Sequence, residues 1–283
     1  MNIELLVGFG VLGLVIGSFL NVVIYRLPVI LKDRYREECL TYLNYHINNS
    51  PRKLGISLPL SFCPDCYIPL KWWHKIPLLS YLILGGKCYF CKAEISRYYP
   101  LVEGITAVTT LIVVSFFGVT SIKVYLALVF TWYLLVITVI DIKHQLLPDC
   151  LTLSLLWIGL LANSAGVFVD PVSAIIGAAG GYSFLWIIAG LFRWVRKAEG
   201  IGYGDFKLLA ALGGWFGWQL LLPIILGASL LGGMLGLILT LNKNISYNQP
   251  IPFGPFLAVF GWLSLFGLMT DGILLISWWN FHV

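Results

Sequence analysis

The sequence predicts an all-α polytopic membrane protein, and three observations lead to that fold class. First, 59% of the 283 residues are hydrophobic and only 11% are charged, whereas a soluble domain is about 45–50% apolar and about 25% charged. Second, apolar stretches of roughly 20 residues, the length that spans a bilayer, recur along the chain. Third, 11 of the 18 Lys and Arg residues lie in segment 26–100. This composition excludes an ordinary soluble domain, a coiled coil and a disordered chain.

We expect about eight membrane-spanning helices. They are predicted near 3–25, 101–118, 123–141, 150–168, 172–192, 206–222, 223–241 and 254–279. No basic residue precedes the first apolar run and no A-x-A pattern follows it, which favours a retained helix over a removed signal peptide. Only Leu222-Pro223 separates the sixth span from the seventh, so a single kinked or re-entrant pair is an alternative there.

The basic residues predict the orientation, because loops rich in Lys and Arg face the cytoplasm. Segment 26–100 is then cytoplasmic and the N-terminus lies outside. Loops 142–149, 193–205 and 242–253 fall on the same side and carry most of the remaining basic residues, Lys143, Arg193, Arg196, Lys197 and Lys243. The opposite loops hold little beyond Lys123 and Asp170. A basic loop between apolar spans predicts the lipid bilayer as a partner, and no nucleic acid.

Three domains follow from this pattern: a first membrane helix at 1–25, a cytoplasmic loop domain at 26–100 and a membrane-embedded domain at 101–283.

The loop domain carries two C-x-x-C pairs separated by 21 residues, Cys63, Cys66, Cys88 and Cys91. Four thiolates bind Zn²⁺ tetrahedrally and leave no open position, so the predicted metal is structural. A reducing cytoplasm disfavours disulfides; a redox dithiol and unlinked thiols are the alternatives. Cys39 and Cys150 are expected to be free thiols.

Two aspartates stand at the ends of predicted spans. Asp141 closes the third span and Asp205 opens the sixth, both on the cytoplasmic side. An ionisable residue at such a place is costly and indicates function. Two facing carboxylates can share a proton, so that one activates a water molecule while the other polarises a carbonyl. Gly202 and Gly204 lack side chains and would let a substrate backbone approach Asp205; a helix-capping role for each aspartate is the alternative.

Several other acidic residues and glycines are predicted to have structural roles. Asp149 and Asp170 each stand before an apolar run and are predicted to be helix N-caps. Glu103 is predicted to be a first-turn acid, with a role in a site as the alternative. Gly13 and Gly17 are predicted to let the first helix pack closely against a neighbour.

Five sequence blocks in order, spread over nearly the whole chain, resemble the type IV prepilin peptidase family of bacteria. They are Gly17-Ser-Phe-Leu-Asn-Val-Val-Ile-Tyr-Arg-Leu-Pro28, the four-cysteine loop with Tyr99-Pro-Leu-Val-Glu103, Asp141-Ile-Lys-His-Gln-Leu-Leu-Pro-Asp149, Gly202-Tyr-Gly-Asp-Phe-Lys-Leu-Leu-Ala-Ala-Leu-Gly213 and Pro250-Ile-Pro-Phe-Gly-Pro-Phe-Leu-Ala258. A lone G-x-G-D would be a weak signal. The sequence departs from the family pattern at Arg97, one position further from Pro100 than usual, and at Lys143, where many relatives have an acid.

The resemblance implies a membrane-embedded aspartic protease of the G-x-G-D type, with Asp141 and Asp205 as its catalytic acids. It implies that the enzyme cuts the basic leader from prepilins or pseudopilins after a glycine and then methylates the new N-terminal amine with S-adenosylmethionine. It also implies the bacterial inner membrane, an active site at the cytoplasmic face, and a pilus or type II secretion machinery as partner.

The methyltransferase is harder to place, because no Rossmann-type G-x-G-x-x-G follows a predicted strand. Asn21, Arg26 and Glu103 are candidates for this activity. The alternatives are a peptidase without methylation and, from another class, a cation-coupled transporter that relays protons through the two aspartates. A zinc-stabilised assembly scaffold would leave the paired aspartates unexplained.

Overall fold

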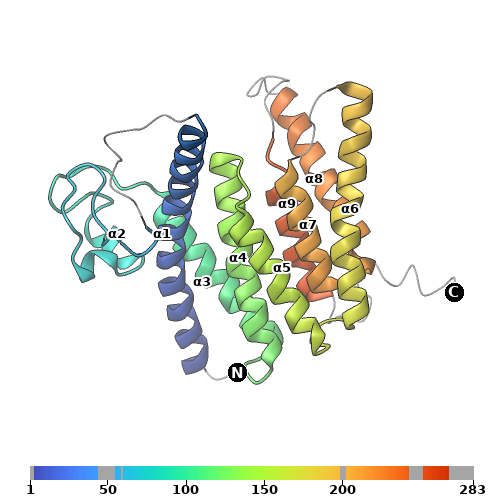
Figure 1. Ribbon diagram of the computed structural model, residues 1–283. Coiled ribbons are helices and arrows are strands. Elements are labelled where there is room, and N and C mark those ends of the chain that lie inside the picture. The colour runs from blue at the N-terminus through green and yellow to red at the C-terminus, as the bar shows by residue number, and fades with distance from the viewer. Residues whose placement is uncertain (1–2, 44–54, 59, 198–201, 242–250, 268–283) are drawn as a thin grey trace. The chain divides into compact units, whose positions relative to one another are not determined.

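The computed structural model describes residues 3–43, 55–58, 60–197, 202–241 and 251–267. The described chain is nearly all helical, as the sequence predicts (Figure 1). Its extended pairings are two isolated bridges, Phe62 with Pro69 and Lys87 with Glu94. The chain divides into two compact units, Met1–Val124 and Tyr125–Val283, and each is described by itself.

In the first unit, α1 (Ile3–Tyr42) packs along α3 (Tyr98–Phe117). Between them in sequence lie the 3₁₀ helix η1 (Trp72–Lys75) and the short α2 (Leu79–Ile83). A Cβ on Gly13 would lie 2.7 Å from the Cα of Ala107, and one on Gly17 would lie 2.8 Å from the Cα of Glu103. The two glycines therefore allow the backbones to touch, and their predicted packing role is confirmed.

The first helix is longer than predicted, because α1 continues through Pro28 to Tyr42. The apolar run ends near Arg26, but residues 30–42 consist largely of Leu, Lys, Arg and Glu, which favour the helical state. Hydropathy locates a membrane span and carries no information about where the helix itself stops. The charged continuation shows that the span and the helix are different segments here.

The second unit contains α4 (Ile122–His144, from Tyr125 on), α5 (Asp149–Ser164), α6 (Pro171–Arg196), α7 (Tyr203–Phe216), α8 (Leu221–Leu241) and α9 (Gly254–Gly267). Helix α7 is its core element and packs against α5, α6 and α9. From Asp205 to Phe216 every residue except Lys207 is buried. A Cβ on Gly181 of α6 would lie 2.8 Å from the Leu209 carbonyl oxygen of α7, so these two helices also meet at their backbones.

The boundary between the sixth and seventh predicted helices falls before Leu222-Pro223. Helix α7 ends at Phe216, and its C-cap Gly217 has a φ of 77°, in the left-handed region, which glycine adopts without steric cost. The 3₁₀ helix η2 (Trp218–Leu220) leads into α8, and Pro223 lies in the first turn of α8. An amide there has no partner within the helix, so proline is tolerated at that place.

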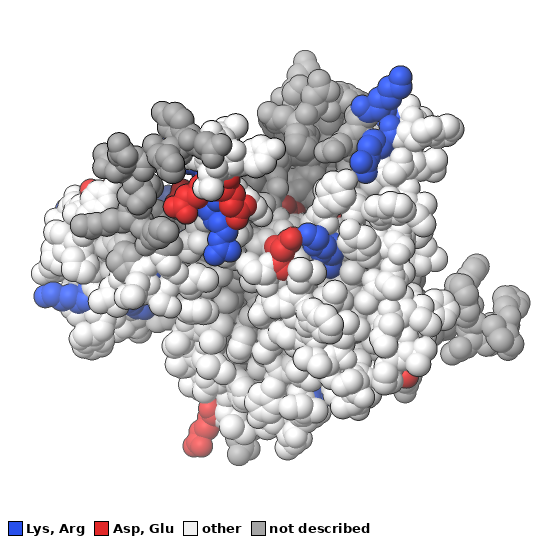
Figure 2. All heavy atoms as spheres, viewed as in Figure 1, with Lys and Arg blue, Asp and Glu red and all other residues white. Residues whose placement is uncertain are grey.

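Several helices suit a membrane interior. In the described residues, five segments have the length and apolar composition to cross a bilayer: α1, α3, α4, α6 and Trp218–Leu241. Helices α5 and α9 are apolar but shorter, and residues 268–279 of the eighth predicted span lie outside the described residues. Figure 2 shows a face that is mostly uncharged, with Lys, Arg, Asp and Glu gathered in a few small groups. The chain is therefore a multi-pass membrane protein, and the predicted total of about eight spans remains a prediction.

Candidate active site, cysteine cluster and pocket

Asp141 lies in the last turn of α4, and its side chain is buried. The helix ends just after it, because Gln145 has a φ of 50° and donates its backbone N–H to the Asp141 carbonyl at 2.8 Å. Gly254, at the start of α9, lies directly against the carboxyl group, since a Cβ there would come within 2.5 Å of Asp141 Oδ2. A side chain at position 254 would thus displace the carboxyl group.

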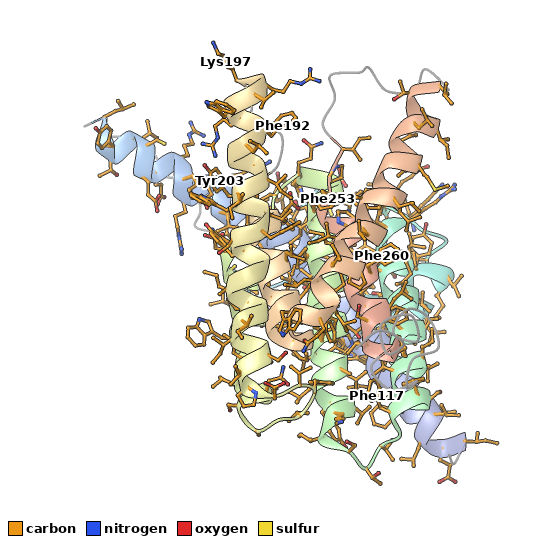
Figure 3. All side chains as sticks on the ribbon, turned by 90° about the vertical axis from the view of Figure 1, so that its right-hand side faces the viewer. Phe117, Phe192, Lys197, Tyr203, Phe253 and Phe260 are labelled. Carbon is orange, nitrogen blue, oxygen red and sulfur yellow. The ribbon has the colours of Figure 1, made fainter. Side chains whose placement is uncertain are left out.

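Asp205 lies in the first turn of α7 and is buried as well. Its backbone N–H donates to the carbonyl of Gly202, the N-cap residue, at 3.1 Å. Figure 3 shows Tyr203 and Phe253 at the same end of this unit, where α7 and α9 begin. Asp205 and Gly254 follow these residues in sequence.

One leucine links the two aspartate segments. A Cβ on Gly204 would lie 2.5 Å from the Cβ of Leu147, and one on Gly254 would lie 3.2 Å from Leu147 Cδ2. Gly204 is therefore needed for packing against Leu147, whereas Gly202 is exposed and a Cβ there would meet only Asp205 Oδ2, at 3.4 Å. The predicted role of the two glycines in substrate approach remains a prediction. The Asp141 carboxylate is near enough to act electrostatically on Asp205, so the two buried carboxyl groups are neighbours, and their catalytic role remains a prediction.

Each of these aspartates has one carboxyl oxygen without a partner. In the described part of the chain, three buried side-chain polar atoms lack a hydrogen bond: Asp141 Oδ2, Asp205 Oδ1 and His74 Nε2. Buried polar atoms are normally paired, and an exception indicates a place where water, substrate or a ligand binds. A capping role alone would leave these two oxygens unexplained.

Two other acids of this unit have structural roles. Asp170 is the N-cap of α6 and accepts the Ser173 backbone N–H at 2.7 Å, as predicted. Asp149 differs from the prediction, because Pro148 occupies the N-cap position of α5. The Asp149 carboxylate instead forms an ion pair with Lys207, with Nζ 2.6 Å from Oδ1. This pair joins the start of α5 to the turn of α7 that carries Asp205.

In the first unit, the two C-x-x-C pairs form two similar turns. In each turn the residue four positions after the first cysteine, Tyr67 or Lys92, has a positive φ and donates its backbone N–H to that cysteine's carbonyl. The four sulfur atoms all lie within 4.8 Å of one another, and Cys63 Sγ lies 3.8 Å from Cys91 Sγ. Tetrahedral Zn–S bonds of about 2.3 Å require sulfur separations of about 3.8 Å.

The four thiols of the cluster differ in how readily they ionise. The backbone amide of Cys91 points at the Cys88 sulfur and, with that of Phe90, lowers the pKa of the Cys88 thiol to about 7. Metal ions bind the thiolate form, which the turn geometry favours at Cys88, whereas burial and the neighbouring thiols raise the pKa values of Cys63 and Cys91. The four predicted ligands can hold a metal ion, while Cys39 and Cys150 are exposed and belong to no disulfide, as predicted.

A pocket of about 830 Å³ lies within the same unit. Its walls come from α1, α3, η1, α2 and the cysteine loop, and it is lined by all three predicted methyltransferase candidates, Asn21, Arg26 and Glu103. Asn21 Nδ2 donates to the Tyr99 carbonyl at 3.0 Å, and Glu103 Oε2 accepts the Leu78 amide at 2.9 Å. The methyltransferase role of the three stays a prediction, but Glu103 also ties the loop to α3.

Sequence reasoning did not find two features of these sites. The Lys207–Asp149 ion pair joins residues far apart in sequence, and only its position beside Asp205 could have suggested a role. His74 stands in an aromatic stretch, Trp72-Trp73-His74, with no motif around it. Its burial and its unpaired Nε2 become visible only in three dimensions.

Comparison with known proteins places the chain in a family. Residues 128–237 match the type IV leader peptidase family, and residues 11–117 match the bacterial peptidase A24 N-terminal domain. A prepilin leader peptidase/N-methyltransferase from Pseudomonas aeruginosa is 47% identical over 254 residues, which are 90% of this chain and 87% of that protein. The chain belongs to the type IV leader peptidase family.

Two further relatives in the type IV leader peptidase family carry the same name. The protein from Legionella pneumophila is 44% identical over 91% of this chain and 89% of its own length. The one from Burkholderia pseudomallei is 42% identical over 90% of this chain and 83% of its own length. No solved structure matches the chain. These comparisons favour neither the transporter nor the scaffold alternative.

Proposed function

We propose that this chain removes the leader peptide from prepilins or pseudopilins and then methylates the new N-terminus. The relatives at 42–47% identity are prepilin leader peptidase/N-methyltransferases. The observation that carries the peptidase assignment is the pair of buried aspartates, each with one carboxyl oxygen unpaired. The leader's basic character and the cut after a glycine remain expectations from the family resemblance.

Peptide hydrolysis at this pair requires the two carboxyl groups to hold one proton between them. The ionised carboxylate removes a proton from water, whose oxygen attacks the scissile carbonyl carbon. The protonated carboxyl donates its proton to the carbonyl oxygen, and the C–N bond then breaks as the amine takes up a proton. The unpaired atoms Asp141 Oδ2 and Asp205 Oδ1 are available for these contacts.

The peptidase assignment is tested with purified protein in detergent and a prepilin substrate. Asp141→Asn and Asp205→Asn are each expected to slow cleavage at least about a hundredfold. Asp170→Asn is the matched control, because Asn caps a helix as well as Asp does and Asp170 is the N-cap of α6. Full cleavage by either active-site variant would exclude the two-aspartate mechanism.

The methylation assignment has a separate test. Labelled S-adenosylmethionine is added to the same reaction, and the mature substrate is examined for the label at its N-terminus. The proposed function requires label in the product. An active peptidase that never labels its product would reduce the function to cleavage alone.

For the cysteine cluster we propose a structural Zn²⁺ bound by Cys63, Cys66, Cys88 and Cys91. Their separations fit tetrahedral sulfur coordination, and four protein ligands leave no position for substrate. The ion would hold the two turns of the loop together.

For the cellular setting we propose the bacterial inner membrane, with the N-terminus outside and the aspartate site at the cytoplasmic face. The distribution of basic residues supports this orientation, although Lys243 lies outside the described residues. The partner would be a pilus or type II secretion machinery, because such machineries assemble the processed substrates.

A further inference from the structure

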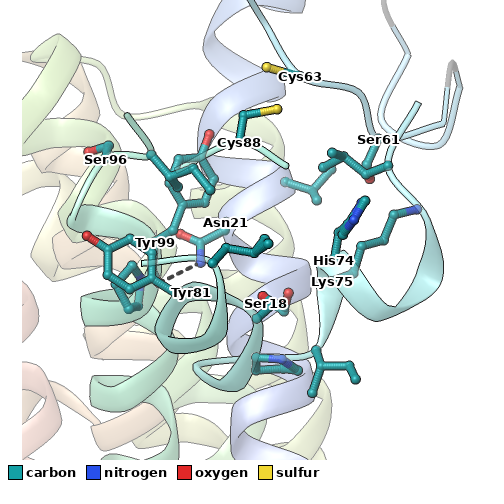
Figure 4. A pocket seen from close by; sticks show the side chains of 18 of the residues that line it. Ser18, Asn21, Ser61, Cys63, His74, Lys75, Tyr81, Cys88, Ser96 and Tyr99 are labelled. Atoms are coloured by element: carbon teal, nitrogen blue, oxygen red, sulfur yellow. Dashed lines mark hydrogen bonds between the residues drawn. The ribbon is translucent and has the colours of Figure 1, made fainter. Parts of the chain in front are cut away.

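The pocket of the first unit has the size of a cofactor site. Its volume of about 830 Å³ lies within the range of about 300–1,000 Å³ typical of small-molecule sites. Figure 4 shows Ser18 and Asn21 of α1 between Tyr81 and Tyr99 on one side and His74 with Lys75 on the other. The pocket lies apart from the two aspartates in the sequence, and the peptidase mechanism uses none of its residues.

Several polar side chains that line the pocket form hydrogen bonds with backbone groups of neighbouring segments. Asn21 and Glu103 bind backbone groups of Tyr99 and Leu78, and Arg26 Nη1 donates to the carbonyls of Gly55 and Ile56 at 3.1 and 2.9 Å. These bonds tie the two membrane helices to the loop. They give the pocket fixed walls.

His74 differs from these residues, because one of its ring nitrogens is unpaired. Its side chain is 8% exposed. Nδ1 accepts the Lys71 backbone N–H at 3.2 Å, so in the neutral ring the proton resides on Nε2. Burial, and the nearby charge of Lys71, lower the pKa of His74 and favour this neutral form. The result is a buried N–H donor without a partner, at the wall of a pocket.

The ring is held in place by aromatic neighbours. The Tyr89 ring centroid lies 5.4 Å from that of His74 and the Phe90 centroid 5.7 Å from it. The ring therefore cannot turn away to find another partner without disturbing this packing. A ligand whose acceptor atom reaches Nε2 would remove the cost of leaving this buried donor unpaired.

The remaining lining suggests the chemistry of the ligand. Aromatic rings that could stack on a nucleobase or face a cation line the pocket: Tyr25, Trp72, Tyr81, Tyr89 and Tyr99. Carboxylates line it too, from Asp65, Glu94 and Glu103, together with the cations of Arg26 and Lys75, which could pair with a ligand carboxylate. Aromatic faces and carboxylates attract cations, and a nucleobase offers both a flat ring and acceptor nitrogens.

We propose that this pocket binds S-adenosylmethionine and that the Nε2–H of His74 donates a hydrogen bond to an acceptor atom of that molecule. The inference rests on the proposed methyltransferase function and assigns that function a site. When bound, the cofactor supplies a methyl group on a positively charged sulfur. The substrate's neutral amine forms the N–C bond as the C–S bond breaks, the electron pair goes to sulfur, and the amine's proton passes to water.

The test is direct binding, independent of turnover. Equilibrium dialysis with labelled S-adenosylmethionine compares wild type in detergent with His74→Leu, which has no donor, and His74→Gln, which keeps an N–H donor. We expect Kd to rise about tenfold or more for the leucine variant and less than about threefold for the glutamine variant. Metal content at the four cysteines, unchanged in both variants, shows that the loop is folded.

The outcomes separate this inference from the proposed function. Wild-type affinity in His74→Leu would overturn the inference and leave the methyltransferase standing if the product still carries the label. Equal weakening of both variants, with metal retained, would assign the effect to ring packing and overturn the hydrogen bond. A wild type that cleaves prepilin but binds no S-adenosylmethionine would overturn the inference together with the methyltransferase half of the function.

Discussion

The amide side chain of Asn163 binds the C-terminal end of α7, the core helix of the second unit. Nδ2 donates to the carbonyls of Gly214 and Trp215, at 2.8 and 2.9 Å. Oδ1 accepts the backbone N–H groups of Phe168 and Val169, at 2.9 and 3.2 Å. The last carbonyls of a helix have no partner within it, so the fully buried Asn163 satisfies two of them and fixes the turn after α5 at the same time.

We predict that Asn163→Ala lowers the free energy of unfolding by at least about 2 kcal/mol, because it leaves four backbone groups without their partner. Asn163→Asp is expected to cost as much or more, since a carboxylate cannot donate and would face two carbonyl oxygens. Thermal unfolding in detergent measures both. Ser164→Ala, at the exposed neighbouring position, is the control and should stay within about 0.5 kcal/mol; similar values for positions 163 and 164 would contradict the prediction.

For single residues, the sequence was sufficient to predict those roles that depend on neighbours in the chain. The cap at Asp170 and the packing glycines Gly13 and Gly17 belong to this class. Asp149 was assigned the wrong structural role, because its ion-pair partner Lys207 is distant in sequence. His74 was not predicted at all, because an unpaired atom is defined by what surrounds it in space.

Among the elements, α1 and α3 depend on close backbone contact. Gly17→Ala would place a Cβ 2.8 Å from the Cα of Glu103, whereas Gly8 of the same helix has nothing within 4 Å. We predict that Gly17→Ala costs about 1–3 kcal/mol of stability, because the two helices must separate. It should also weaken S-adenosylmethionine binding, since both helices line the pocket.

Gly8→Ala is the matched control for that prediction. The same substitution in open space should be neutral or stabilising by up to about 1 kcal/mol, because alanine favours the helix. Thermal unfolding and dialysis on the two variants give the comparison. Equal effects at positions 8 and 17 would exclude helix contact as the cause.

The Lys207–Asp149 pair connects α5 to the first turns of α7, and its predicted effect is on catalysis. The side chains are 25% and 57% exposed, and such pairs contribute only about 0–1 kcal/mol to stability. We predict that Lys207→Met slows prepilin cleavage about threefold to tenfold, because Asp205 lies in the turn that the pair holds and small displacements at a catalytic group are costly. The double variant Asp149→Lys, Lys207→Asp should recover part of the loss. Wild-type cleavage by Lys207→Met would show that the pair does not position Asp205.

Helix locations were predictable because hydropathy reports directly on which segments avoid water. The starts of α3, α4, α5 and α6 fall within a few residues of the predicted spans. The end of α1 was not predictable in this way, since residues 30–42 are helical and charged. The break between α7 and α8 was placed late, because Pro223 was interpreted as a separator whereas Gly217 ends the helix.

In the molecule as a whole, the two units carry different candidate sites. The described cysteine cluster and the pocket belong to Met1–Val124, and the two aspartates belong to Tyr125–Val283. The two family matches, 11–117 and 128–237, divide at nearly the same place. The described loop of the first unit contains few regular elements, so an ion held by the four sulfur atoms would add to the order that its hydrogen bonds to α1 and α3 provide.

We therefore predict that removing the metal loosens the first unit and leaves the fold of the second intact. Purified protein should contain about one Zn²⁺ per chain, and Cys63→Ser should lower this content, because three thiolates bind the ion less tightly than four. Limited proteolysis of the chelator-treated protein should then cut within residues 60–97, because metal binding and folding of such a loop are coupled.

Cys150→Ser removes an exposed thiol outside the cluster and should change neither the metal content nor the cleavage pattern. An unchanged metal content in Cys63→Ser would exclude the four-cysteine site, and new cuts throughout the second unit would show that its fold also depends on the ion.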